Sequence, residues 1–418
     1  MPRRLAVIHH PRSQRPEELF KAIGDAAELL WVVVDGEDGG RIRRVLLERL
    51  GPVVEISSTD LDGAATKLRE AGTDGVVTFV DVLVPVVAEL ALRLGLPGTS
   101  VESAAGLTDK FLQRQALEQA GVPQPRFWRL QAGLSPEQLS EIGTTVTYPA
   151  VIKPTHGAGS AGVQRLDSAS DLSSAYQPDI EQLIEEYMPD RDVQNQSFGS
   201  YVSVESVVSG ETISHAAVSG RFPLNEGFRE NGIFIPAALE PAEEADVLRV
   251  ATRAIRALGV TNSCLHIEIK LTPDGPKIIE VNGRVGGGPP AVLASVSDVH
   301  LFRLAAEIAL GRAVRFETVV PCSAIGYWWD VNPPMDATEV LAIHGTLELS
   351  ESPLVDRVDI RCPPGTVLDT SLGTIGVICV RGRASTLEEL TKVTGLINST
   401  ITIDYQRAEP VSFRDASS

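Results

Sequence analysis

Two glutamates are predicted to face each other across a β-hairpin. Residues 266–288 read HIEIKLTPDGPKIIEVNGRVGGG, in which two alternating runs flank a Thr-Pro-Asp-Gly turn. If the hairpin is centred on Asp274, Glu268 lies opposite Glu280 on one face, because side chains alternate along a strand. Like charges about 5 Å apart on paired strands destabilise a sheet. The same centre pairs His266 with Asn282 and Lys270 with Ile278.

A divalent cation between the two carboxylates is one explanation. Glu268, Glu280 and the amide oxygen of Asn282 are hard oxygen ligands, which suit Mg²⁺ held partly by protein and partly by nucleotide phosphates. Two alternatives stay open. The hairpin face could be exposed to water, where the glutamates repel only weakly, or one carboxyl group could keep its proton through a raised pKa.

An arginine and three glycines follow the second strand. Arg284 continues the even-numbered series, and its guanidinium suits phosphate or carboxylate oxygens. A structural salt bridge is the alternative for an isolated arginine. Gly286, Gly287 and Gly288 come next and give a backbone that a ligand can approach closely.

A second glycine-rich stretch, HGAGSAG at residues 156–162, contains a literal GxGxxG in Gly157, Gly159 and Gly162. Residues 163–166 have strand character and do not open a helix, so the context differs from a dinucleotide fingerprint. The stretch predicts a mobile hairpin whose backbone N–H groups could close over phosphates, with Lys153 supplying charge at its base. An ordinary surface hairpin is the alternative.

The elements that must position these residues begin with an alternation of strands and helices over the first hundred residues. Short β-branched runs such as LAVIHH, LLWVVVDG and DGVVTFV alternate with helical patterns such as PEELFKAIGDAAEL. This alternation predicts a parallel sheet flanked by helices, in which ligands usually bind beyond the carboxyl ends of the strands. His9 and His10 lie at one such end, and a packed or solvated histidine is the alternative to a catalytic one.

From Thr108 the pattern changes. Residues 108–121 predict an amphipathic helix with an N-cap candidate, and residues 121–130 predict a proline-bounded extended segment. Strands are expected on both sides of the glycine-rich stretch. The expected elements after it are a short helix at 168–176, a strand or hinge at 182–190, two strands around Gly210, and helices at 241–259 and 298–311.

The final hundred residues return to β-rich runs and predict a separate small α+β domain. The runs cover 324–331, 345–352, 357–365 and 373–383, and a helix at 386–397 and a last strand at 400–406 follow them.

Length, charge and cysteine spacing narrow the class of protein. The 418 residues predict two to four domains. The formal net charge of -18 argues against a general nucleic-acid or membrane-surface binder, which needs clustered Lys and Arg. The four cysteines, Cys264, Cys322, Cys362 and Cys379, form no CxxC, which favours reduced thiols over a zinc site or a disulfide framework. We therefore expect a cytoplasmic protein with no nucleic-acid or membrane partner.

The order of these pieces resembles the ATP-grasp superfamily of carboxylate–amine ligases. Asp109-Lys110 opens a helix, Lys153 precedes the glycine-rich stretch, and EEYM at 185–188 comes before Glu268 and EVNGR at 280–284. The spacing between the first acid, Glu268, and Glu-x-Asn-x-Arg differs from the spacing that is usual in the family. The resemblance implies a multi-domain α/β and α+β chain with the ATP-grasp fold. Its expected parts are an N-terminal parallel α/β domain at 1–108, a grasp subdomain with the lid at 109–190, a grasp subdomain with the metal site at 191–318, and a C-terminal small α+β domain at 319–418.

The resemblance also implies a site for ATP and Mg²⁺, for which Mn²⁺ can substitute. Glu268, Glu280 and Asn282 would bind the metal, and Arg284 and Lys153 would act on the transferred phosphoryl group. Asp192 stands where relatives often place a ribose-binding acid. Lys110 and Lys153 would contact the phosphates of ATP. The flexible lid would consist of His156, Gly157, Gly159, Ser160 and Gly162. The adenine hinge would consist of Glu185, Glu186, Tyr187 and Met188, and backbone groups of Glu186 and Met188 would contact the edge of the base.

Within the superfamily the chain is most similar to the dipeptide-forming L-amino acid ligases, through YVSVESVV, the HIEIKL strand and the size of the C-terminal domain. The implied reaction passes from a carboxylate and ATP through an acyl phosphate to an amide and ADP. Packed or solvated roles are the alternatives for His266, Arg221 and Glu230. The implied amino-acid pocket contains Glu205, Arg221, Glu230, His266 and Arg284, with Gly286, Gly287 and Gly288 as a floor that leaves room for a larger substrate.

Two other functions remain under consideration. A biotin-carboxylase-like enzyme shares the Glu and Glu-x-Asn-x-Arg arrangement, but the chain has no biotin-carrier MKM motif. A non-catalytic nucleotide-binding protein of the same fold is the other, and the retained lysines and metal ligands argue against it. The expected partners are small-molecule carboxylates and amines, with a homodimer as one candidate assembly.

Overall fold

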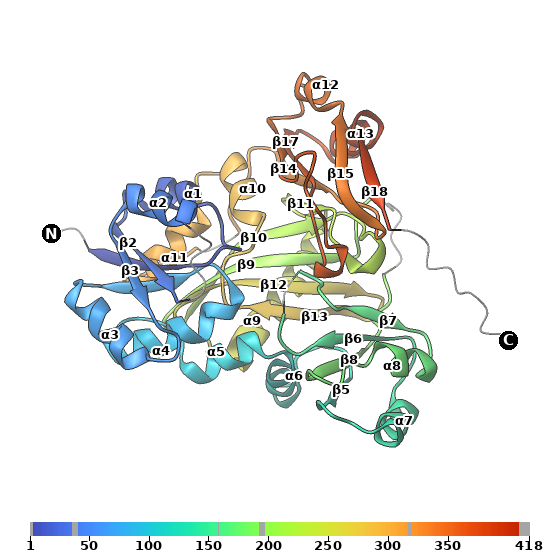
Figure 1. Cartoon of the computed structure of the whole chain (residues 1–418), viewed down its shortest axis with the longest axis horizontal. Coiled ribbons are helices and arrows are strands. Elements are labelled where there is room, and N and C mark those ends of the chain that lie inside the picture. Colours follow the sequence, from blue (N-terminus) through green and yellow to red (C-terminus); the bar gives the residue numbers. More distant parts are fainter. Residues whose placement is uncertain (1–2, 36–40, 158, 192–196, 317–318, 409–418) are drawn as a thin grey trace.

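The computed structural model describes residues 3–35, 41–157, 159–191, 197–316 and 319–408. The described strands form sheets of four, eight, two and four strands, and the eight-stranded sheet runs through the middle of the molecule in Figure 1. None of the helices in these ranges is long and apolar enough to cross a membrane.

The N-terminal sheet is parallel, as the sequence predicts. Its strands are β1 (Arg4–His9), β2 (Glu28–Val34), β3 (Val53–Ile56) and β4 (Gly75–Thr78), in the order β3-β2-β1-β4. The accompanying helices are α1 (Pro16–Ile23), α2 (Arg41–Leu50), α3 (Leu61–Glu70) and α4 (Val84–Leu94), with the 3-10 turn η1 (Asp81–Leu83) directly after β4.

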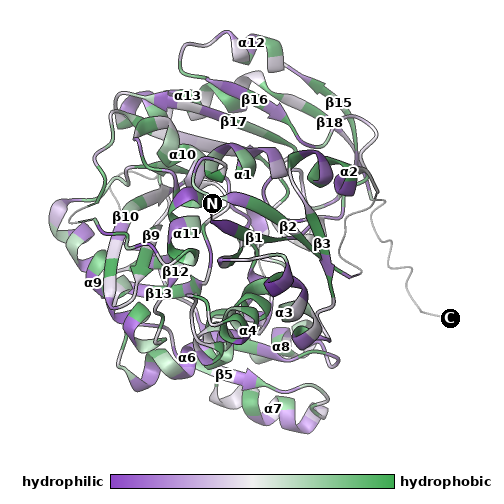
Figure 2. Ribbon diagram, turned by 90° about the vertical axis from the view of Figure 1, so that its left-hand side faces the viewer, coloured by the Kyte–Doolittle hydropathy of each residue, from purple (hydrophilic) through white to green (hydrophobic). Residues whose placement is uncertain are grey.

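Helices cover both faces of this sheet, so its strands are apolar on both sides. Leu5 and Val7 of β1 belong to the same core as Leu19 of α1. Ala6 and Ile8 belong to a second core with Leu68 of α3. Figure 2 shows the resulting hydrophobic character along β2.

Two helices connect this domain to the rest of the chain. The sequence predicts a helix at 108–121, and the structure has α6 (Lys110–Gln119) there, preceded by α5 (Val101–Thr108), which was not predicted. Asp109 is the N-cap, and its carboxylate accepts hydrogen bonds from the backbone N–H groups of Phe111 and Leu112 at 2.8 and 3.1 Å. Lys110 is thereby fixed at the first position of α6.

A small antiparallel sheet carries the glycine-rich stretch. Its strands, in the order β5-β8-β6-β7, are β5 (Phe127–Leu130), β6 (Ala150–Pro154), β7 (Gln164–Leu166) and β8 (Gln182–Glu186). The helices α7 (Pro136–Thr145) and α8 (Ala169–Ala175) lie in the same segment of the chain. The predicted strands on both sides of residues 156–162 are confirmed, because β6 and β7 pair with each other.

Where β9 and β12 border the cavity, the central sheet places apolar residues on one face and polar residues on the other. Val204 of β9 and Ile267 of β12 are buried in one core with Val247 of α9 (Pro241–Ala257). The opposite face carries Glu205 and His266, which are register partners. The strands, in the order β13-β12-β9-β10-β11-β14-β17-β16, are β9 (Tyr201–Ser209), β10 (Thr212–Arg221), β11 (Gly232–Ile235), β12 (Ser263–Thr272), β13 (Gly275–Asn282), β14 (Ile325–Val331), β16 (Arg357–Ile360) and β17 (Ile378–Ala384).

The register of the β12–β13 hairpin is partly as predicted. Glu268 pairs with Glu280, and His266 pairs with Asn282. The predicted pairing of Lys270 with Ile278 is wrong, because a bulge after Glu268 shifts the register and Lys270 pairs with Lys277. A bulge places two residues of one strand opposite one residue of the other, so the simple parity rule fails beyond it.

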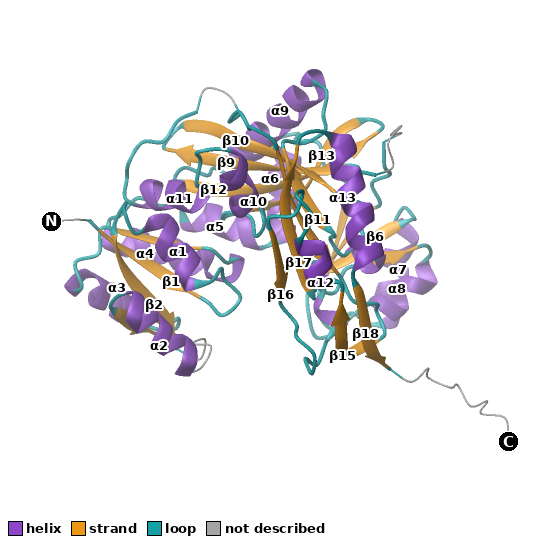
Figure 3. Cartoon of the chain, turned by 90° about the horizontal axis from the view of Figure 1, so that it is seen from above, coloured by secondary structure: helices purple, strands orange, loops and turns teal. Residues whose placement is uncertain are grey.

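The C-terminal strands β14, β17 and β16 continue the central sheet. A separate two-stranded sheet is formed by β15 (Ala337–His344) and β18 (Thr402–Arg407), and Figure 3 shows it at the opposite end of the molecule from the N-terminal sheet. The β-rich character predicted for 345–352 is wrong, since this segment contains α12 (Thr346–Ser350), which begins after Gly345 in the left-handed region at φ 84°. The remaining elements are α10 (Pro289–Val296), α11 (Leu301–Ala309), α13 (Leu387–Thr400), η2 (Glu226–Phe228) and η3 (Thr370–Leu372).

Candidate active site

One cavity of about 960 Å³ lies between the small antiparallel sheet and the polar face of the central sheet. It brings together most residues that the sequence selected: Lys110, Lys153, Gly157, Gly159, Ser160, Glu185, Glu186, Tyr187, Met188, Glu230, His266, Glu268, Glu280, Arg284 and Gly287. The selected residues outside its described lining are His156, Gly162, Glu205, Arg221, Asn282, Gly286 and Gly288. Asp192 lies outside the described residues.

Lys110 links the lid to the pair of glutamates. Its Nζ donates to the carbonyl of Gly157 at 2.8 Å and lies 2.9 Å from a carboxylate oxygen of Glu280. Burial lowers the pKa of Lys110, but the carboxylates of Glu280, Asp81 and Glu185 outweigh burial, and the net shift is upward. Lys110 is therefore a cation that faces the cavity.

Lys153 is held by a buried carboxylate. Its Nζ lies 2.8 Å from one oxygen of Glu185, and the Nε of Arg114 donates to the other at 2.7 Å. Burial raises the pKa of Glu185, but Arg114 and Lys153 outweigh it and lower the pKa to about 2. Arg114 also donates to the carbonyls of Ile278 and Ile279 at 3.2 and 2.6 Å. The Glu185 side chain is thus occupied in positioning Lys153.

The hinge after β8 offers fewer free backbone groups than the sequence suggests. The N–H of Glu186 donates to the carbonyl of Arg126 at 2.9 Å, and the N–H of Tyr187 donates to the carbonyl of Pro149 at 3.1 Å. A contact from Glu186 to a base edge would therefore use its carbonyl. Met188 follows, and its backbone makes no hydrogen bond to another backbone group of the described residues.

The glycine-rich stretch lies over the cavity and contacts two distant segments. Ser160 Oγ donates to the carbonyl of Phe228 at 3.0 Å, and the N–H of Thr374 donates to the carbonyl of Gly159 at 3.0 Å. His156 points elsewhere: its side chain is 68% exposed, with Nε2 4.0 Å from Asp109.

The predicted metal ligands fit a hard divalent cation. Glu268 and Glu280 are register partners on one face, and both line the cavity. Burial raises the pKa of Glu268, but hydrogen bonding and charge from His266 outweigh it and lower the pKa to about 2, so the carboxylate is ionised. The described residues contain no group of three His, Cys, Asp or Glu that could hold a metal. The third predicted ligand, Asn282, is buried outside the cavity lining, and its Nδ2 donates to the carbonyl of His266 at 3.4 Å.

A charged network extends from these glutamates across β12, β9 and β10. His266 Nδ1 lies 2.7 Å from Glu205, and its Nε2 lies 3.4 Å from Glu268 and 3.1 Å from Arg221 Nη2. Burial lowers the pKa of His266, but Glu205 and Glu268 outweigh burial and raise the pKa to about 9. Arg221 in turn pairs with Glu230 at 2.8 Å. Glu205 and Arg221 are therefore buried supports, whereas His266 and Glu230 line the cavity.

The glycines at 286–288 lie next to this network. A Cβ on Gly286 would lie 2.6 Å from His266 Nδ1, so this position requires glycine. A Cβ on Gly287 would meet nothing within 4 Å, which is consistent with its open position at the cavity wall.

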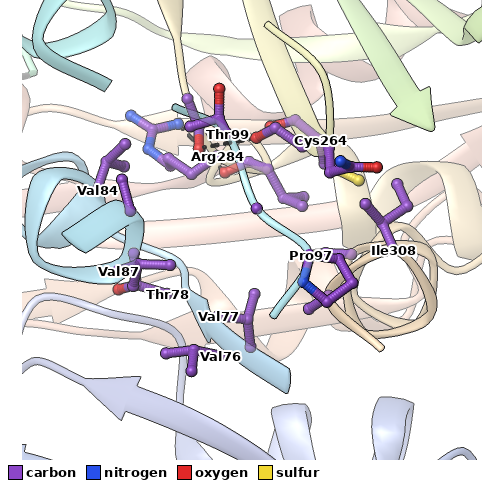
Figure 4. Close-up of a pocket in the computed structure, with 18 residues that line it drawn as sticks. Val76, Val77, Thr78, Val84, Val87, Pro97, Thr99, Cys264, Arg284 and Ile308 are labelled. Carbon is purple, nitrogen blue, oxygen red and sulfur yellow. Dashed lines mark hydrogen bonds between the residues drawn. The ribbon is translucent and has the colours of Figure 1, made fainter. Parts of the chain in front are cut away.

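Arg284 is held by the N-terminal domain. Its Nε and Nη2 donate to one oxygen of Asp81 at 3.0 and 2.7 Å. Arg284 borders both the large cavity and a smaller one of about 60 Å³, which Figure 4 shows between Val76, Val84 and Cys264. Burial lowers the pKa of Arg284, but Asp81 outweighs it and raises the pKa.

Many residues of the site were not selected from the sequence, and Arg114, Asp81, Ile279 and Tyr201 illustrate why. Arg114 pairs with Glu185 and Asp81 pairs with Arg284. The members of each pair lie far apart in the chain, so no local sequence pattern connects them. Ile279 enters the cavity lining because the hairpin bulge changes the side-chain alternation. Tyr201 could have been found, since it continues the odd-numbered series of Glu205 on the polar face of β9.

Comparison with known proteins identifies the fold and the central domain. The model of the ATP-grasp domain matches residues 146–290, and that of the ATP-grasp N-terminal domain matches residues 55–98. The chain is similar to an L-amino acid ligase structure from Bacillus licheniformis, with a TM-score of 0.78 and 20% identity over 97% of this chain and 99% of that chain. The predicted ATP-grasp fold is confirmed.

Two curated relatives are ligases or synthases by name. The alanine–anticapsin ligase of Bacillus subtilis is 27% identical over 65% of this chain and 58% of its own length. Carnosine synthase 1 of Gallus gallus is 28% identical over 55% of this chain and 27% of its own length. The matched region thus spans about half or less of these relatives.

Proposed function

Because the chain carries an ATP-grasp domain, we propose that it is an ATP-dependent, ADP-forming ligase that joins a carboxylate to an amine. The observation that carries this proposal is a single cavity whose lining brings together Lys110, Lys153, Arg284, the opposed pair Glu268 and Glu280, and His266 with its carboxylate partners. Phosphoryl transfer depends mainly on positioned cations, and amide formation needs both reactants beside the same phosphoryl group.

In the proposed reaction a carboxylate oxygen attacks the γ-phosphorus of ATP, and the bond to the bridging oxygen of ADP breaks. The amine nitrogen then attacks the acyl carbon, inorganic phosphate leaves, and the ammonium proton passes to solvent. Lys110 and Lys153 neutralise charge on the phosphates, and Arg284 stabilises the transferred group. Glu268, Glu280 and Asn282 would hold Mg²⁺, or Mn²⁺ in its place, which supplies further charge neutralisation when bound.

An amino acid is the substrate class that the site supports best. His266 and Glu230 present opposite charges to the cavity, and Glu205 and Arg221 brace them from behind. An α-amino acid carries both a carboxylate and an ammonium group, so it complements such a pair. The names of the two curated relatives also point to amino-acid substrates. A cytoplasmic location and a homodimeric state complete the proposal.

The test is phosphate release from ATP over pairs of amino acids and other amines, followed by mass determination of the product. We expect ADP and phosphate in equal amounts and a product heavier than the carboxylate substrate by the amine minus water. ATP binding without phosphate release from any pair would favour a non-catalytic binding protein. Turnover that requires bicarbonate and biotin would favour a carboxylase.

A further inference from the structure

The lining of the large cavity includes two groups of apolar side chains. Val151, Met188 and Ile279 surround the hinge side. The other apolar group comes from the start of β9 and from the loop after β10: Phe198, Tyr201, Pro223, Leu224 and Phe228. We call these five residues the aromatic end of the cavity. Leu224 is 38% exposed and Phe228 is half-buried, so both present apolar surface to the cavity instead of completing a core.

Two residues of the cavity lining, Ser160 and Phe228, have a strained backbone conformation. Among the described residues, Ser160 and Phe228 are the two non-glycine residues with positive φ, at 63° and 58°. They are bonded to each other through Ser160 Oγ and the carbonyl of Phe228. A bulky residue rarely adopts this conformation, and such strain clusters at ligand clamps.

The surrounding loop enforces the conformation of Phe228. The N–H of Asn225 donates to the carbonyl of Arg229 at 2.8 Å, which closes a tight loop around Phe228. The buried Arg229 anchors that loop by donating to the carbonyls of Glu226 at 3.0 Å and Pro333 at 2.7 Å. Phe228 lines the cavity, and its backbone carbonyl is tied to Ser160 of the glycine-rich stretch.

A polar atom at the aromatic end lacks a partner. The hydroxyl of Tyr201 is buried without a hydrogen bond in the described structure, and the tyrosine is only 5% exposed. Its ring lies beneath the guanidinium of Arg221, 5.6 Å from the ring centroid. Burial raises the pKa of Tyr201 well above its ordinary value, so the hydroxyl remains a donor at neutral pH. Buried hydroxyl groups are normally satisfied, and this one belongs to a residue of the cavity lining.

We propose that the aromatic end is the subsite for a large apolar side chain, branched aliphatic or aromatic, on one of the two amino-acid substrates. The side chain packs against Leu224 and Phe228, and the Tyr201 hydroxyl donates to an oxygen of the same substrate. This inference rests on the proposed ligase function and adds the substrate class to it.

The test compares single amino acids in the phosphate-release assay with the full-length protein. Glycine, alanine, leucine, phenylalanine, glutamate and lysine are each paired with all the others. We expect kcat/KM for leucine or phenylalanine to exceed that for glycine, glutamate and lysine by about tenfold or more. Activity that prefers glutamate, lysine or glycine would leave the ligase standing and overturn the subsite.

Two variants test the Tyr201 hydroxyl and the apolar side chain of Leu224 independently of each other. Tyr201→Phe keeps the ring and should raise KM for the apolar substrate about tenfold while KM for ATP changes little. Leu224→Ser should cut the preference for leucine over alanine by a similar factor. Leu347→Ser is the control, because Leu347 is 85% exposed on the distant α12. Equal kinetics in Tyr201→Phe, Leu224→Ser and the control would overturn the assignment.

The subsite can also be tested if the protein proves not to be a ligase. If no pair releases phosphate, calorimetric titration of the ADP-saturated protein with phenylalanine and with glycine still tests the subsite. Binding of phenylalanine that is lost in Leu224→Ser supports it, and absence of phenylalanine binding overturns it.

Discussion

Lys153 and Arg284 both face the cavity and are both held by a carboxylate, but the two pairs are built differently. Lys153 and Glu185 lie on adjacent strands of one small sheet, and Arg114 of the nearby helix α6 completes the group. Arg284 is held by Asp81, which lies 203 residues earlier in another domain. The first pair is set by strand register, whereas the second forms only when the N-terminal domain docks on the central sheet.

The two pairs also differ in burial. The side chains of Lys153 and Glu185 are 8% and 6% exposed, while those of Arg284 and Asp81 are 16% and 17% exposed. Breaking a buried ion pair leaves an uncompensated charge and is costly. We therefore expect the Lys153 group to affect stability and nucleotide binding, and the Arg284 pair to affect the rate of reaction.

The largest effect is expected at Glu280, which lies between the two regions and contacts Lys110. Glu280→Gln removes a charge that both Lys110 and the proposed Mg²⁺ require, so turnover should fall by at least about 10³-fold with the fold retained. Phosphate release and circular dichroism measure the two outcomes. Glu211→Gln, at the exposed β9–β10 turn, is the matched control, and wild-type rates in Glu280→Gln would remove the metal assignment.

Arg114→Met tests the buried group. It leaves the Glu185–Lys153 pair without its second cation inside the protein, and we expect a loss of about 3 kcal/mol or more in the free energy of unfolding. Chemical denaturation measures this loss. ADP affinity should weaken as well, because Lys153 loses its fixed position. A change below about 1 kcal/mol would show that Arg114 is dispensable for the group.

Asp81→Asn tests the bridging pair. The amide can still accept a hydrogen bond from Arg284, but the charge that fixes the guanidinium is gone, and kcat should fall about tenfold while ADP affinity stays within about twofold. Arg284→Ala should lower kcat further, by about 10²-fold. If Asp81→Asn instead weakens ADP binding and leaves kcat intact, the contrast between the two regions fails.

The smallest effect is a dependence on pH at Glu185. Its pKa is about 2 in the folded protein against an ordinary value of 4.5. The stabilisation is complete above pH 4.5 and is lost as pH falls through the folded pKa. Relative to Glu185→Gln, the wild type should lose on the order of 1 kcal/mol between pH 7 and pH 4. Denaturation curves at both pH values measure the difference, and a constant difference would contradict the charged pair.

The sequence predicted the fold and somewhat fewer than half of the residues that line the cavity, because these follow from local patterns and their order. It failed beyond Glu268, where the hairpin bulge moves Lys270 from Ile278 to Lys277 and brings Ile279 into the cavity lining. It also failed at 345–352, where a single helical turn follows Gly345. A five-residue helix is too short for its periodicity to be distinguished from that of a strand.

The sequence by itself determined the polar face of the hairpin, the pairing of Glu268 with Glu280, and the order of lysines, glycine-rich stretch and Glu-x-Asn-x-Arg. These depend on alternation within a strand, which is a property of neighbouring residues. Only the tertiary structure decided which carboxylate holds each cation, that Glu205 and Arg221 support the site from behind, and that Phe228 and Tyr201 line the same cavity. Those contacts join residues far apart in the chain, and their partners are selected by domain docking and burial, for which no local pattern exists.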